Sequence, residues 1–231
     1  MISFKAEDRV AEIVIDRPSA GNAVTSDMAR QFAEAMRDAV ATSDILVIKG
    51  RGGDFTIGRD RHEPKSGSPF DAFRTVSALN RAIVGFPGIV ITSVRGRAHG
   101  LGVGLIMRSN IAIASDSAQF GLDEVAHGIP PMFIMEEIVE HLPDKTAFDI
   151  VLSGRSFGAP EALQMGLVSR VVPDHALDST VGELVGTLRS RDRKVVLACK
   201  RYLQAVRKVP VDARPAFALL EQTEFAMEGR S

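Results

Sequence analysis

Two glycine-containing turns hold the residues whose types and spacing could do chemistry. The segment "GRAHGLGVG" (residues 96–104) has glycines at 100, 102 and 104, and "DFTIGRD" (residues 54–60) follows the apolar run "ILVIKG". Unpaired N–H groups at a helix N-terminus stabilise negative charge, and glycine lets an acyl carbon approach the backbone closely. Two such donors from two turns would form an oxyanion hole. Tight turns with a purely structural role would look the same in the sequence.

The glycine spacing argues against two kinds of nucleotide site. The segment reads G-x-G-x-G rather than G-x-G-x-x-G, and no acidic residue closes a following strand, so it does not fit a dinucleotide-binding fingerprint. No Gly-Lys-Ser/Thr follows the glycines, which excludes a P-loop for nucleoside triphosphates.

Composition narrows the class of protein further. The 231 residues include 28 basic and 29 acidic side chains, a balance that argues against a nucleic-acid partner. The single cysteine, Cys199, excludes an internal disulfide and suits a reducing compartment. No secretory signal and no membrane-spanning apolar run are visible. We therefore expect a soluble, cytoplasmic protein without a membrane partner.

The elements that must position these turns alternate between strands and helices. We predict a hairpin from residues 2–7 and 10–16, and a helix from an N-cap at Thr25 or Ser26 with Met28, Phe32, Met36 and Val40 as its buried stripe. Further strands are expected in "DILVIKG", "GIVITSV", "NIAIAS" and "LVSRVV". Further helices are expected at about 69–84, from residue 100, and at 131–141, 143–152 and 158–166. Gly166 would end the last of these helices. The longest irregular stretch is expected at residues 51–69.

This alternation predicts an α/β fold with a mainly parallel sheet. Residues 1–173 would form the α/β core. Residues 174–231 contain no further strand signal, and their composition predicts helices near 175–189, 191–208 and 211–228.

Several motifs together resemble the crotonase superfamily, the enoyl-CoA hydratase/isomerase family. They are "RPSAGNAV" (17–24), "FTIGRD" (55–60), "GRAHGLGVGLIMRSN" (96–110) and "APEALQMGLV" (159–168), in the family's order over nearly the whole chain. The resemblance implies a crotonase-like spiral of ββα units, with residues 174–231 as a helical trimerisation region. It also implies an acyl-CoA thioester as substrate, a homotrimer or a dimer of trimers, and no metal or separate cofactor, coenzyme A being part of the substrate.

The resemblance also implies site residues. The oxyanion donors would be the N–H groups of Ile57 and Leu101, with Gly58 and Gly100 in the same turns. The "RPSAGNAV" loop would lie along CoA, with Ala23 and Val24 nearest the adenine or pantetheine. Arg17 and Lys200 could reach phosphates, although surface lysines and arginines are more often simple solvated charges.

The carboxylates are where this sequence departs from the family. Hydratases of the family use two glutamates; the first corresponds to Gly104 and is absent, and the second corresponds to Glu124 in "LDEVAHG". Two carboxylates are needed to position water and move a proton, whereas one suffices to move a proton between carbons of a thioester enolate. One retained glutamate therefore favours isomerisation over efficient hydration. The alternative for Glu124 is an exposed loop carboxylate or a cap for the next helix.

Other titratable groups could stand in for the missing acid. Asp60 is expected to brace the first turn beside the substrate. The remaining candidates are side chains near the two turns or on the following helix: His99, Arg59, His62, His127, Glu136 and Glu137. A lone histidine on a loop is more often solvated than catalytic.

Two further features keep other functions open. The final segment "LLEQTEFAMEGRS" matches no terminal helix that closes over the acyl pocket in many family members, and "DRHEPKSGSP" is short for the family's acyl-pocket segment. A non-catalytic or weakly active acyl-CoA-binding protein is therefore the main alternative. A hydrolase like the related serine peptidases ranks last, because no serine flanks Leu101.

Overall fold

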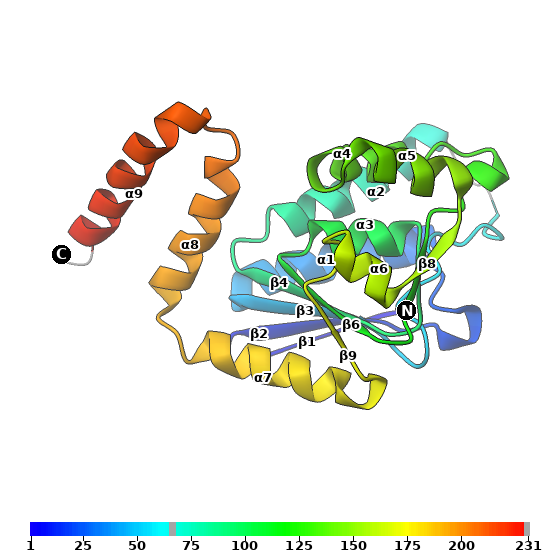
Figure 1. Cartoon of the computed structure of the whole chain (residues 1–231). Coiled ribbons are helices and arrows are strands. Elements are labelled where there is room, and N and C mark those ends of the chain that lie inside the picture. The colour runs from blue at the N-terminus through cyan, green and yellow to red at the C-terminus, as the bar shows by residue number, and fades with distance from the viewer. Residues whose placement is uncertain (65–67, 229–231) are drawn as a thin grey trace. The chain divides into compact units, whose positions relative to one another are not determined.

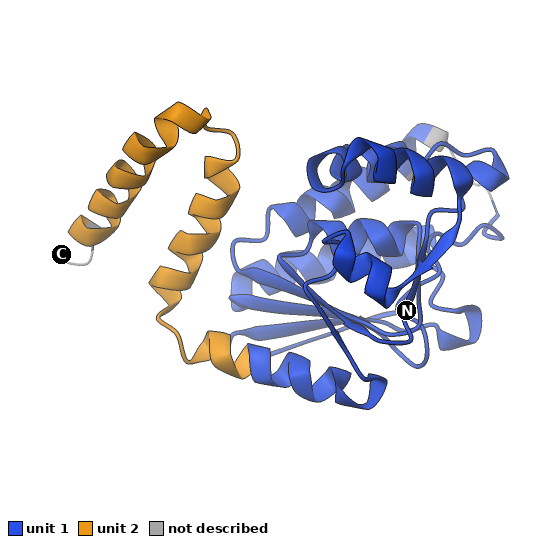
Figure 2. Ribbon diagram, viewed as in Figure 1, with its two compact units in different colours: residues 1–184 blue, residues 185–231 orange. Residues whose placement is uncertain are grey.

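A computed structural model describes residues 1–64 and 68–228 of the chain (Figure 1). Residues 65–67 of the predicted irregular stretch and residues 229–231 of the final segment lie outside this description. The chain divides into two compact units, residues 1–184 and 185–231 (Figure 2). The division falls inside α7 (Leu177–Arg189), whose residues Leu177, Val181 and Leu184 are buried, whereas the predicted boundary lies at residue 173. The predicted trimerisation role of the C-terminal region stays a prediction.

The predicted N-terminal hairpin is confirmed. Strands β1 (Ile2–Glu7) and β2 (Val10–Ile15) pair antiparallel, with Glu7 opposite Val10. The two connecting residues, Asp8 and Arg9, have φ values of +48° and +66°. Positive φ at both central residues defines the type I′ turn that matches the twist of a hairpin.

The larger sheet has the order β1-β2-β3-β4-β6-β9, and all its pairs except β1 with β2 are parallel. The new strands are β3 (Ile45–Gly50), β4 (Ile89–Val94), β6 (Ile111–Ser115) and β9 (Arg170–Val172). The predicted, mainly parallel sheet is therefore confirmed. No strand follows β9 among the described residues.

Three helices, α1 (Ser26–Thr42), α2 (Pro69–Val84) and α3 (Leu101–Arg108), lie over one face of this sheet, and α7 lies along the other (Figure 1). The side chain of Thr25 accepts the N–H of Met28 at 3.2 Å and so caps α1 as predicted. Met28, Phe32 and Met36 are buried, but the prediction for Val40 is wrong because it is 48% exposed. At 3.6 residues per turn the buried stripe passes through Ala39 instead.

A second, smaller sheet joins β5 (Arg97–His99), β7 (Gln119–Gly121) and β8 (Ser156–Gly158). Strands of three residues are too short to show an alternating pattern, so β5 and β8 were not predicted from periodicity. The rings of Phe120 and Phe157 stack across this sheet with centroids 5.6 Å apart. The second sheet places His99 directly before the N-terminus of α3.

The remaining elements follow the predicted order. In the first unit these are η1 (Pro18–Ala20), η2 (Val125–His127), α4 (Met132–His141), α5 (Asp144–Ser153), α6 (Ala159–Gln164) and η3 (Asp174–Ala176). Gly166 follows α6 with φ +78°, as expected of a residue that ends a helix. The second unit contains α8 (Arg193–Val206), η4 (Val211–Ala213) and α9 (Arg214–Glu228), with Tyr202 stacked on Phe217. None of the described helices is long and apolar enough to span a bilayer.

Candidate active site

The two glycine-containing turns meet in the structure. The N–H of Thr56 donates to the carbonyl of Arg97 at 3.0 Å, and the N–H of His99 donates back to the carbonyl of Thr56 at 2.9 Å. Gly102 permits this approach, since a Cβ there would lie 3.0 Å from both the carbonyl oxygen and Cγ2 of Thr56. Gly58, with φ +96°, lies so close that its Cβ would stand 3.5 Å from the nitrogen of Leu101. The prediction that these segments come together is confirmed.

Leu101 has a free backbone donor at this meeting point. It is the first residue of α3, and its N–H has no hydrogen-bond acceptor among the described residues. This is the usual state of the first N–H groups of a helix. The N–H of Leu101 is therefore free, and its role as a donor to an oxyanion stays a prediction.

The N–H of Ile57 is not available, contrary to the prediction. It donates to the carbonyl of Gly21 at 3.0 Å. Two residues later, the N–H of Arg59 has no acceptor in the part of the chain that the structure describes. The positive φ of Gly58 redirects the peptide that follows it, which is the signal that could have pointed to Arg59 rather than Ile57.

Asn22, which the sequence analysis did not single out, holds the first turn in place. It is fully buried with φ +57°. Its side-chain oxygen accepts the N–H of Arg17 at 2.8 Å, and its amide nitrogen donates to the carbonyls of Arg51 at 2.9 Å and Asp54 at 2.7 Å. This set of bonds fixes the "RPSAGNAV" loop against the turn at residues 54–60.

Glu124 lies against the glycine-rich turn. A Cβ at Gly100 would stand only 2.5 Å from Oε1 of Glu124, and Gly100 has φ +50°. The carboxylate therefore occupies the space that any larger residue at position 100 would fill. The structure thus brings Glu124 and the N-terminus of α3 together.

The environment of Glu124 favours its protonated form. Burial is the largest cause that raises the pKa of this carboxyl, and the nearby charge of Asp123 raises it further. A backbone hydrogen bond, Arg61 and His127 act in the opposite direction, but the pKa stays above its ordinary value. The Oε2 atom is buried without a hydrogen-bond partner among the described residues. Glu124 also makes no side-chain cap for η2, so neither alternative reading, an exposed carboxylate or a helix cap, fits.

Position 104 lies beside a buried arginine instead of carrying an acid. A Cβ at Gly104 would lie 3.1 Å from Nη1 of Arg108, whose side chain is 1% exposed. Arg108 donates to the carbonyls of Gly104 and Phe133. It also pairs with Glu136 at 2.7 Å and Glu137 at 3.3 Å. Both acids that could have replaced the missing one are therefore engaged by Arg108, a residue that the sequence analysis overlooked within "LIMRS".

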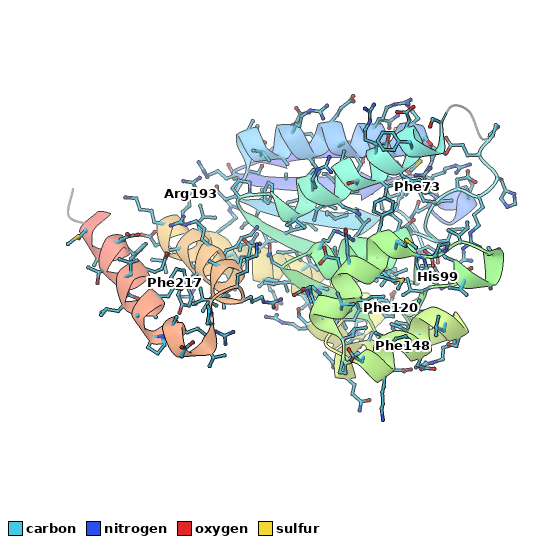
Figure 3. All side chains as sticks on the ribbon, turned by 90° about the horizontal axis from the view of Figure 1, so that it is seen from above. Phe73, His99, Phe120, Phe148, Arg193 and Phe217 are labelled. Atoms are coloured by element: carbon cyan, nitrogen blue, oxygen red, sulfur yellow. The ribbon has the colours of Figure 1, made fainter. Side chains whose placement is uncertain are left out.

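The two predicted histidines have different surroundings. The Nε2 atom of His99 is buried with no partner among residues 1–64 and 68–228, and burial is the main cause that lowers the pKa of this ring. His99 (labelled in Figure 3) is the last residue of β5 in the small sheet. A Cβ at Gly121 would stand 3.5 Å from both Nε2 of His99 and Oγ of Ser156. His127 is 48% exposed and joins Arg61 and the backbone of Asp123. A substrate role for either histidine stays a prediction.

Asp60 braces the first turn, as expected. Its carboxylate pairs with Arg17 at 2.6 Å and accepts the N–H of His62 at 2.9 Å. The hydrogen bond from Arg17 is the largest cause that lowers the pKa of Asp60. Arg17 also donates to the carbonyl of Ala23, so its guanidinium is already engaged.

The predicted CoA-binding residues have structural partners of their own. Ala23 and Val24 are buried, and Val24 bridges to Gly58 and Asp60 through backbone bonds of 2.8 Å and 2.9 Å. Lys200 lies on α8 in the second unit, and burial lowers the pKa of its amine to about 8. Contact of these residues with CoA stays a prediction.

The assembled groups define a class of chemistry. The two turns that meet each supply a free backbone donor, the N–H groups of Arg59 and Leu101, and a carboxyl with a raised pKa lies against Gly100. Donors in such an arrangement can stabilise an oxyanion, and a carboxyl whose pKa is raised holds a proton more readily than an ordinary glutamate does.

The sequence model of the enoyl-CoA hydratase/isomerase family matches residues 5–225. The chain therefore belongs to this family, whose relatives support an enzyme that acts on CoA thioesters. The mouse enoyl-CoA hydratase domain-containing protein 3, mitochondrial (Mus musculus), is 27% identical over 96% of this chain and 75% of its own length. The 2,3-dehydroadipyl-CoA hydratase of Escherichia coli is 28% identical over 97% of this chain and 92% of its own length.

Solved structures show the same fold. A putative enoyl-CoA hydratase from Thermobifida fusca in complex with CoA has a TM-score of 0.89 and 26% identity, covering 100% of this chain and 95% of that one. The enoyl-CoA hydratase of Mycobacterium smegmatis has a TM-score of 0.88 and 24% identity, covering 96% and 89%. The α/β fold is therefore crotonase-like, as the motifs implied.

Proposed function

We propose that this protein moves a proton between carbon atoms of an enoyl-CoA thioester, and that it isomerises the double bond more readily than it hydrates it. The N–H groups of Leu101 and Arg59 would hold the thioester oxygen as its enolate develops. Glu124 would take the proton from C2 of a 3-enoyl-CoA and return it to C4, so that the double bond moves to C2 and no water is consumed.

The observation that carries this proposal is the unpaired, buried carboxyl of Glu124 beside the N-terminus of α3. A group that both takes and returns a proton works best when its pKa is near the operating pH, and burial moves the pKa of Glu124 in that direction. Hydration needs a second carboxylate to position water, but Gly104 supplies none and Arg108 engages Glu136 and Glu137.

The substrate class rests on the family and on the ligands named for its relatives. Two structures of the Thermobifida fusca protein are described as complexes with CoA and with acetoacetyl-CoA. We extend the CoA-thioester ligand to this chain, with the "RPSAGNAV" loop beside it, and assembly into a homotrimer or a dimer of trimers remains part of the proposal.

The test compares two activities in three proteins. Wild type, Glu124→Gln and Glu136→Gln are assayed for isomerisation of 3-enoyl-CoA and for hydration of crotonyl-CoA. Loss of the proton-transfer group should lower isomerisation by about 10²–10⁴-fold in Glu124→Gln, whereas Glu136→Gln, which changes a 58% exposed acid, should keep most of its activity. The kcat/KM of wild type should fall on the acidic side with a pKa above that of an ordinary glutamate.

Fast hydration of crotonyl-CoA that is unaffected by Glu124→Gln would overturn this assignment. The second candidate is a protein that binds acyl-CoA without turning it over, and the replacement of an acid by Gly104 beside Arg108 favours it. Calorimetry that shows acyl-CoA binding, together with no turnover of either substrate, would support that candidate instead.

A further inference from the structure

A polar cavity of about 290 Å³ lies on the α7 side of the larger sheet. Its lining includes Lys49 of β3, Ser93 of β4 and Asp178 of α7. The pairing Lys49↔Ser93 places these two side chains next to each other on adjacent strands. Because side chains alternate across a strand, this face is opposite the one that packs Leu46 and Ile48 into the core with α1. The cavity is therefore separate from the site around Glu124.

Ser93 contributes a hydroxyl to the lining of the cavity. The residue as a whole is 5% exposed, so its position is fixed by the surrounding sheet. A hydroxyl can donate one hydrogen bond to an oxygen of a ligand in the cavity.

Three cations reach the same cavity from two segments, the end of β3 and the residue after β4. Lys49 pairs with Glu12 at 2.7 Å, Arg51 pairs with Asp16 at 2.7 Å through Nε, and Arg95 binds Asp174 at 2.9 Å through Nε. A lysine carries three N–H donors and an arginine five.

Donors therefore remain after these pairs have formed. No bond is made by the terminal nitrogens of Arg51 or by Nη1 of Arg95 within the described residues. Two carboxylates, Glu12 and Asp178, also line the cavity. Glu12 already pairs with Lys49, and Asp178 lies 3.5 Å from Arg95. These pairs limit the repulsion between the two carboxylates and a bound anion.

We propose that this cavity binds a small oxyanion, a phosphate or carboxylate group, held by Ser93 and by the free donors of Lys49, Arg51 and Arg95. An oxyanion offers several acceptor oxygens, which is what a hydroxyl and surplus cationic donors require. Such a ligand would bind independently of the acyl-CoA reaction.

The test measures binding of inorganic phosphate and of succinate by calorimetry at constant ionic strength. Wild type is compared with Ser93→Ala, Lys49→Met and the control Arg37→Met, an exposed α1 residue whose side chain is 70% exposed. We expect saturable binding of at least one anion to wild type, weakened about tenfold in Ser93→Ala and by at least about tenfold in Lys49→Met. The control should bind as wild type does.

The anion that binds distinguishes a phosphate ligand from a carboxylate ligand. Ser93→Ala removes only one oxygen, so it keeps the test decisive if Lys49→Met does not fold. Absence of saturable binding of both anions to wild type overturns the proposal. Binding that is unchanged in Ser93→Ala and in folded Lys49→Met overturns it as well, because the anion would then lie elsewhere.

Discussion

The two ends of α3 hold charged groups in opposite ways. At the N-terminal end, Glu124 lies against Gly100 with a buried oxygen that has no partner among the described residues. At the C-terminal end, Arg108 is more deeply buried, with a side chain that is 1% exposed, but it donates to two carbonyls and pairs with two acids. Both charges suit the helix dipole, which favours anions at the N-terminus and cations at the C-terminus. The dipole alone therefore does not explain the difference.

The difference separates an unpaired carboxyl, for which we propose a chemical role, from a fully paired structural arginine. A buried charge that is fully hydrogen-bonded has little tendency to change its protonation state. In an unpaired buried carboxyl, by contrast, the protonation equilibrium shifts toward the neutral form. The same helix thus has the proposed proton-transfer group at one end and an anchor for α4 at the other. Changes at each end should affect different properties of the protein.

The largest expected effect is on stability, at the C-terminal end. Arg108→Met would leave the carbonyls of Gly104 and Phe133 without this donor and would break the pairs with Glu136 and Glu137. We expect the free energy of unfolding in urea to fall by about 3 kcal/mol. The control Arg30→Met removes an exposed ion pair with Asp27 and should cost less than about 1 kcal/mol. Equal losses in the two variants would refute the structural role of Arg108.

The next effect is on activity, at the N-terminal end. Gly100→Ala would place a Cβ 2.5 Å from Oε1 of Glu124 and displace the carboxylate, which should lower kcat about 100-fold. Gly166→Ala is the matched control, since φ is +78° there and no atom lies within 4 Å of the added Cβ. Both variants should lose about 1–2 kcal/mol of stability through backbone strain. Kinetics at full saturation and urea unfolding separate the two effects, and similar kcat values would argue against a role for Glu124.

A smaller effect concerns the pH dependence of stability. Because the folded-state pKa of Glu124 is raised, its ionisation costs stability as pH rises through that pKa. Glu124→Gln should therefore be more stable than wild type at neutral pH, and this advantage should disappear below the ordinary pKa of 4.5. Urea unfolding at a series of pH values checks this, and an advantage that grows toward low pH would contradict the raised pKa.

The smallest expected effect comes from placing an acid at position 104. In Gly104→Glu the new side chain would begin 3.1 Å from Nη1 of Arg108, and we expect its carboxylate to pair with that guanidinium. Hydration of crotonyl-CoA should therefore not increase measurably. A large gain in hydration would show that Arg108 does not control charge at this position.

Much of the fold could be predicted because long elements carry periodic signals. The stripe at Met28, Phe32 and Met36 predicted α1, and the Asp8–Arg9 pair between alternating strands predicted the hairpin. Val40 was misplaced because a strict spacing of four drifts from the true helical repeat. Strands β5 and β8 have three residues each and are defined by pairing with distant segments, which no local pattern reveals.

The site was predictable where it depends on local chain geometry. Leu101 is a free donor because α3 begins there, and Gly100 and Gly102 were visible as places of close approach. The availability of the N–H of Ile57 depends instead on where the carbonyl of Gly21 lies in the folded chain. The motif position of Glu124 predicted where it would lie, but its lack of a partner required the three-dimensional structure.

The contact between Gly100 and Glu124 also has an evolutionary consequence. The carboxylate stands where a side chain at position 100 would be, so the two positions share one volume. They should therefore be inherited as a pair: descendants that gain a side chain at 100 should carry a shorter residue at 124. A lineage that makes the first exchange without the second would force the carboxylate out of the space that it now occupies.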